Sequence, residues 1–144
     1  MAKIIIVGGV AGGATAATRL RRLSEQDDIL MFERDEHISF ANCGLPYYIG
    51  GVIKSRDRLV VETVEGLTNK FNIDVRNFSE VIGVDRQKKE IVVKEVKTGK
   101  TYTETYDKLI LSPGAQPIRI PTPGLDEATN VFTLRNIPDT DKIR

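Results

Sequence analysis

The segment IIIVGGVAGG, residues 4–13, decides the fold because it joins four large apolar residues to a cluster of glycines. Such a short apolar run, ended by a turn, predicts a strand buried on both faces of a parallel sheet. The small residues that follow, Ala14–Leu20, predict a helix that continues to about Ser24, and Ile29–Phe32 predict a second strand. Strand, helix and strand together predict a right-handed βαβ unit.

The glycine turn predicts a dinucleotide-binding site. A tight turn from strand to helix brings backbone amides and the helix N-terminus against a pyrophosphate, and side chains there would block the approach. The fingerprint requires glycine at its first, third and sixth positions, and the sequence has Gly8 and Gly13 but Val10 in the middle. Glu33 ends the second strand, where it can accept hydrogen bonds from an adenosine ribose. Together these features favour FAD or NAD binding over a turn that serves only helix–sheet packing.

The remaining pattern predicts an α/β fold in which an antiparallel meander accompanies the parallel sheet. We expect a short helix from Cys43, irregular chain before it from Arg34, and a proline-rich arm over residues 117–138 that leads to a helix start at Asp139. The other expected elements are a helix at Val64–Phe71, a strand at Ile73–Arg76, meander strands at 81–84, 90–96 and 101–106, and a buried strand at Leu109–Leu111.

The composition is that of a soluble globular domain. The chain has 144 residues, of which 40% are apolar and 28% charged, and a net charge of +1. This charge gives no support for nucleic-acid or membrane binding, and no apolar run is long enough to cross a bilayer. One cysteine forms no internal disulfide, and no His/Cys cluster suggests a metal. A reducing, cytoplasmic location is therefore expected.

The lone cysteine, Cys43, has two possible roles. Most single cysteines are small buried hydrophobic residues. Cys43, however, follows the polar Asn42 and is expected to open a helix with Pro46 in its first turn. The positive end of the helix dipole favours a thiolate there. The residues alone leave both roles open.

Residues 39–43, Ser-Phe-Ala-Asn-Cys, resemble the single-cysteine motif of the pyridine nucleotide–disulfide oxidoreductases, in particular the coenzyme A-disulfide reductase branch. The resemblance covers essentially the whole chain. Besides the Cys43 motif it rests on the Gly8 turn, Glu33-Arg34, Ser79-Glu80-Val81, Ser112-Pro113-Gly114-Ala115 and Thr133-Leu134-Arg135-Asn136.

The resemblance implies a Rossmann-like, glutathione reductase-like FAD-binding domain that is incomplete in this chain. Residues 1–116 would be its N-terminal part, and residues 117–144 an arm toward a missing NAD(P)-binding domain. We therefore expect a fragment of a longer, homodimeric enzyme that is inactive on its own.

The resemblance also implies a mechanism and a set of site residues. NAD(P)H would reduce the flavin, which would pass electrons to Cys43, and Cys43 would alternate between a thiolate and a mixed disulfide with coenzyme A or a similar small thiol, or act on a related persulfide. The implied FAD contacts are Gly8, Gly9, Ala11, Gly12, Gly13, Glu33, Arg34, Val81, Ser112 and Gly114. The implied substrate contacts are Thr15, Arg19, Arg22, Ser39, Asn42 and Lys70, and the match at Lys70 is loose by a residue.

Three alternatives accompany these expectations. Thr15, Arg19 and Arg22 share one helix face, which on residues alone is an ordinary solvated face. An NADH oxidase or peroxidase would use a Cys43 sulfenic acid, but such enzymes usually carry a histidine where Ala11 stands, and the only histidine, His37, is expected to be a solvated loop residue. A non-catalytic nucleotide-binding module is the alternative from another class.

Overall fold

A computed structural model describes residues 1–144, which divide into two compact units. Unit 1 comprises residues 1–40 and 62–113, and unit 2 comprises residues 41–61 and 114–144. Unit 1 contains a parallel sheet whose strands lie in the order β3-β2-β1-β7. Their bounds are β1 Lys3–Val7, β2 Asp28–Phe32, β3 Asp74–Arg76 and β7 Lys108–Leu111.

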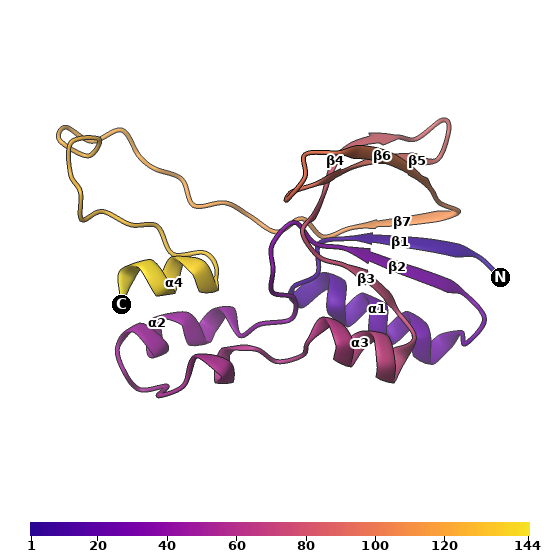
Figure 1. Cartoon of the computed structure of the whole chain (residues 1–144), viewed down its shortest axis with the longest axis horizontal. Helices are drawn as coiled ribbons and strands as arrows, with labels where there is room; N and C mark the ends of the chain where they lie inside the picture. The colour runs from indigo at the N-terminus through magenta and orange to yellow at the C-terminus, as the bar shows by residue number, and fades with distance from the viewer. The chain divides into compact units, whose positions relative to one another are not determined.

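Helices cover one face of this sheet and the meander covers the other (Figure 1). Helices α1 (Ala11–Leu23) and α3 (Val64–Phe71) pack their apolar residues against alternate residues of the strands, among them Ile6 and Met31. On the opposite face the antiparallel strands β4 (Ser79–Asp85), β5 (Glu90–Glu95) and β6 (Thr101–Thr105) bury Ile91 and Val93 against Ile5. Because both faces are covered, the central strands β1 and β2 are apolar after their first residue, as the sequence predicted.

Charged side chains join the parallel sheet to the meander. Arg76 of β3 donates to Asp74 and to Glu104 of β6, each at 2.8 Å, and Lys3 of β1 also pairs with Glu104. Partial burial acts to raise the pKa of the Glu104 carboxyl, but the hydrogen bonds from Lys3 and Arg76 outweigh it, so the pKa is lowered. Partial burial likewise acts against the charged form of Arg76, yet its hydrogen bonds to Asp74, Tyr102 and Glu104 raise its pKa. Arg76 and Glu104 therefore stay charged at neutral pH.

Unit 2 is built from short helical segments. A 3-10 turn η1 (Asn42–Gly44) leads into α2 (Leu45–Ile49), which is followed by the 3-10 helix η2 (Arg56–Leu59) and, later in the chain, by α4 (Ile137–Ile143). Helices α2 and α4 lie side by side (Figure 1). Arg56 forms an ion pair with Asp141 at 2.8 Å, and the Arg144 guanidinium lies 4.4 Å from the centre of the Tyr48 ring. None of the helices in the chain has the length and apolar character that a membrane crossing requires.

The structure confirms the α/β class, and the expected bounds of α3 match those observed. Helix α1 begins at Ala11 rather than Ala14, because the glycines of the turn already adopt helical conformation. Helix α4 begins at Ile137 rather than Asp139, because the Asn136 side chain accepts a hydrogen bond from the Asp139 amide at 3.1 Å and caps the helix. The sequence pattern does not predict η2.

The Arg21 side chain links the carboxyl-terminal end of α3 to the segment that follows α1. Its guanidinium donates to five backbone carbonyls: those of Phe71 and Asn72 at the end of α3, and those of Ser24, Glu25 and Asp27 after α1. The carboxyl-terminal ends of two helices thus converge on one cation, which is favourable to both helix dipoles.

Replacing this side chain should destabilise unit 1. We expect Arg21→Ala to lower the free energy of unfolding by about 3 kcal/mol, since several charge-assisted hydrogen bonds are lost together. Urea denaturation followed by circular dichroism measures this directly. Arg86→Ala, at an exposed turn position, serves as the control. Equal stability of the two variants would contradict the role given to Arg21.

Candidate functional site

Two positions of the turn accept only glycine, because another part of the backbone lies too close for a Cβ. Gly8 has φ +97°, and a Cβ there would overlap the backbone carbonyl of Ser112 at the end of β7. A Cβ on Gly13 would overlap the carbonyl of Gly8, so α1 can press against the end of β1 only without a side chain at this position. Gly12 differs, since its Cβ would lie 3.3 Å from the nearest atom, Cβ of Ser112, and the residue is exposed. Gly12 and the neighbouring Ala11, also exposed, present the start of α1 to solvent.

Glu33 is buried at the carboxyl end of β2, with 7% of its surface exposed. One carboxylate oxygen accepts a hydrogen bond from the Gly9 amide at 2.8 Å, and the other accepts from the Asp35 amide at 2.9 Å. The sequence pattern predicts a ribose contact for Glu33 but not its hydrogen bond to the glycine turn. Each carboxylate oxygen has two lone pairs, so acceptor capacity remains for a ligand.

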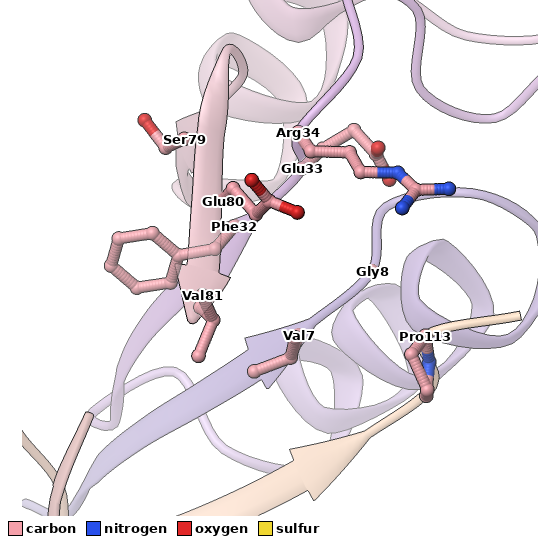
Figure 2. A pocket seen from close by; sticks show the side chains of 9 residues that line it. All are labelled: Val7, Gly8, Phe32, Glu33, Arg34, Ser79, Glu80, Val81 and Pro113. Atoms are coloured by element: carbon pink, nitrogen blue, oxygen red, sulfur yellow. The ribbon is translucent and has the colours of Figure 1, made fainter. Parts of the chain in front are cut away.

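A cavity of about 100 Å³ opens beside these residues, where the parallel strands end (Figure 2). Its apolar part includes Val7 and Val81, which approach each other from facing strands, and its polar part includes Glu33, Arg34 and Glu80. The full lining is Val7, Gly8, Phe32, Glu33, Arg34, Ser79, Glu80, Val81 and Pro113. Ligands of open α/β sheets bind at the carboxyl ends of the strands, which is where this cavity lies.

Strand β4 presents a free backbone edge. It is the edge strand of the meander, and it pairs only with β5. The Ser79 amide donates to the Glu33 carbonyl at 2.8 Å and therefore points away from β5. Backbone groups alternate in direction along an antiparallel pair, so the N–H and C=O of Val81 also point away from β5. Val81 thus offers one donor and one acceptor to a ligand.

Cys43 lies in the turn η1, directly before α2, and its side chain is exposed. Pro46 lies in the first turn of α2, as expected. The exposure rules out the alternative of a small buried hydrophobic residue. Next to it, Oδ1 of Asn42 is buried and has no hydrogen-bond partner, an arrangement that is costly unless a ligand or water supplies a donor.

The residues predicted to bind a phosphate-bearing substrate differ in their surroundings. Thr15, Arg19 and Arg22 are exposed on α1, and neither arginine forms an ion pair. Lys70 already donates to Glu62 at 2.9 Å, a hydrogen bond that lowers the pKa of the Glu62 carboxyl. Ser39 has φ +43°, and its amide donates to the Gly9 carbonyl at 3.0 Å, which ties the Ser39 segment to the glycine turn.

The predicted site residues fall into both units. Unit 1 contains all of the predicted FAD contacts except Gly114, together with the substrate candidates Thr15, Arg19, Arg22, Ser39 and Lys70. Unit 2 contains Asn42, Cys43 and Gly114. Gly114 has φ +74°, and a Cβ there would lie 2.6 Å from Nη2 of Arg135, so this position too requires glycine.

Comparison with known proteins shows the family of the chain. The model of the family "Pyridine nucleotide-disulphide oxidoreductase" matches residues 2–144. The chain belongs to the pyridine nucleotide-disulphide oxidoreductase family.

Among its relatives, the chain is 46% identical over 143 residues to a coenzyme A disulfide reductase of Staphylococcus aureus, and the match covers 99% of the chain but 32% of that protein. The reduced CoADR-RHD of Bacillus anthracis superimposes with a TM-score of 0.96 at 60% identity, over 99% of this chain and 26% of the other. An NAD-dependent persulfide reductase from A. fulgidus gives a TM-score of 0.91 at 31% identity, over 98% and 27%. The chain thus spans about a third of the curated reductase that it matches.

The two adjacent glycines of the turn should respond differently to substitution. Gly13→Ala forces α1 away from Gly8 and should lower the free energy of unfolding by about 3 kcal/mol. Gly12→Ala places its methyl group 3.3 Å from Cβ of Ser112, a tight contact that a small shift can relieve, on a helical backbone that favours alanine, so it should change the free energy of unfolding by no more than about 1 kcal/mol. Urea denaturation of both variants tests this contrast, and equal losses would show that the backbone approach at Gly13 is not the constraint.

Proposed function

We propose that this chain is the N-terminal, FAD-binding part of a disulfide reductase in which Cys43 is the redox-active thiol and coenzyme A disulfide, or a related disulfide or persulfide, is the substrate. The observation that carries the proposal is the exposed thiol of the only cysteine, at a helical turn beside an unpaired amide oxygen of Asn42. The likeness to coenzyme A disulfide reductases over 99% of the chain supports the choice of substrate. NAD(P)H would be the electron donor of the complete, homodimeric and cytoplasmic enzyme.

The residues of unit 1 suit an FAD molecule. Close packing leaves no side chain at Gly8 and Gly13, and exposed Gly12 lets a pyrophosphate approach the start of α1. Glu33 would accept hydrogen bonds from the ribose, Arg34 would lie over the mouth of the cavity, and the free backbone groups of Val81 would meet the adenine. Ser112 and Gly114 belong to the turn that would close over the cofactor. When bound and reduced, the flavin would supply the two electrons that return Cys43 to its thiolate state.

Cys43 would act by thiol–disulfide exchange. Its thiolate attacks one sulfur of coenzyme A disulfide, the disulfide bond breaks, and one coenzyme A leaves as a thiolate that takes a proton from water. Cys43 is then joined to the second coenzyme A as a mixed disulfide. Two electrons and a proton break this bond and release the second coenzyme A thiol. Because the chain has a single cysteine, no internal disulfide competes with the mixed disulfide.

The charges on α1 suit the phosphates of coenzyme A. Arg19 and Arg22 are exposed and unpaired, so their guanidinium groups are free to bind phosphate. Thr15 on the same face would add a hydroxyl donor, and Ser39 and Asn42 would contact the substrate near its sulfur. Lys70 would have to exchange Glu62 for a phosphate, which makes its contribution the smallest of the set.

The exchange step can be tested on the chain itself. Incubation with coenzyme A disulfide should attach one coenzyme A to the native chain and release one coenzyme A thiol, as measured by intact mass spectrometry and a thiol assay. Cys43→Ser should give neither product. A native chain that reacts no faster than the urea-unfolded chain would contradict an activated Cys43.

If Arg19 and Arg22 bind phosphate, removing them should slow the reaction with coenzyme A disulfide but not the reaction with an uncharged disulfide. Arg19→Ala with Arg22→Ala should slow the reaction of Cys43 with coenzyme A disulfide about 10-fold, because two phosphate contacts are lost. The reaction with uncharged hydroxyethyl disulfide should keep its rate. Arg86→Ala with Lys94→Ala, which removes the same charge from exposed positions of the meander, is the matched control. Equal slowing with both disulfides would mean that the arginines do not bind phosphate.

A further inference from the structure

We propose that Glu80 selects the base of the bound nucleotide, by accepting a hydrogen bond from the exocyclic amino group of adenine. This inference rests on the nucleotide site proposed above and assigns a specificity to it. The site would thus discriminate adenine from purines that lack this amino group.

Glu80 is the carboxylate in the cavity that has no partner of its own. It is partly buried, lines the cavity, and forms neither a hydrogen bond nor an ion pair. Figure 2 shows its carboxylate directed into the space between β4 and the Gly8 turn. A carboxylate is an acceptor only, so Glu80 can bind a ligand only through a hydrogen-bond donor of that ligand.

The other groups of the cavity leave the amino group of the base as that donor. Adenosine carries donors on its two ribose hydroxyls and on its amino group. Glu33, at the end of β2, stands where the ribose hydroxyls of a bound dinucleotide are held. The amino group has two hydrogens, and the C=O of Val81 at the free edge of β4 can accept only one of them in its plane. Glu80, the neighbour of Val81 in the same strand, supplies an acceptor for the second hydrogen.

The same arrangement disfavours hypoxanthine. In hypoxanthine a carbonyl oxygen replaces the amino group, so an acceptor would face the Glu80 carboxylate and the Val81 carbonyl. Unpaired acceptors that face one another in a partly buried site weaken binding strongly. The base is therefore recognised by attraction and repulsion together.

The test compares ADP with IDP, which differ in the base alone, by calorimetric titration of the 144-residue chain. The wild-type chain should bind ADP about 10-fold more tightly than IDP. Glu80→Ala should lower the ratio of the two dissociation constants clearly below the wild-type value while IDP binding is retained, and the Val81 carbonyl accounts for the preference that remains. Glu80→Gln should keep most of the preference, because its amide oxygen still accepts a hydrogen bond. Glu25→Ala, which removes an exposed carboxylate at the opposite end of the strands, should behave as the wild type.

The outcomes separate this inference from the proposed function. A wild-type chain that binds both nucleotides equally, or a Glu80→Ala variant that keeps the wild-type ratio, overturns the role of Glu80 and leaves the nucleotide site in place. Equal weakening of ADP and IDP by Glu80→Ala also overturns it and assigns the side chain to the ribose or to the fold. A wild-type chain that binds neither nucleotide overturns the proposed site itself.

Discussion

The contact between Gly13 and the carbonyl of Gly8 is the constraint on which unit 1 depends. Helix α1 starts directly behind the end of β1, at a distance that leaves no room for a Cβ. The same turn touches the backbone carbonyl of Ser112, so β1, α1 and β7 meet through close backbone contacts at the carboxyl end of the strands. The Ser112 hydroxyl adds a hydrogen bond to the Val7 carbonyl at 3.0 Å. Glu33, at the end of β2, also ties this strand to the turn, because its carboxylate accepts a hydrogen bond from the Gly9 amide. The rigid end of the sheet that results is where the cavity opens.

Much of this architecture could be predicted from the sequence, since local patterns encode it. The apolar run before Gly8 and the periodic residues of α3 predicted their elements because burial imposes those patterns. The start of α4 was misplaced because Asn136 acts as a cap through its side chain, which a proline-rich segment conceals. The 3-10 helix η2 was missed because a single turn with charged residues has no apolar periodicity.

The candidate site was predictable to the extent that it rests on sequence motifs. The glycine turn, Glu33 and Cys43 stand out in the sequence for their residue types and spacing. The bond from Gly9 to Glu33 and the pairing of Lys70 with Glu62 could not be foreseen, because they depend on side-chain directions across separate elements. The backbone edge at Val81 depends on the hydrogen-bond alternation of β4, which is set by tertiary contacts and leaves no trace in residue type.

The pairing of β4 with β5 shifts register between Val81 and Gly83, just beyond the part of β4 that lines the cavity. A bulge interrupts the ladder and absorbs local changes in strand length and twist. Beyond the bulge, the hairpin that turns at residues 86–89 can change in length or fluctuate without moving the backbone of Ser79–Val81 in β4. The exposed turn at residues 86–89 is thus the part of the meander where a reporter group can be attached away from the cavity.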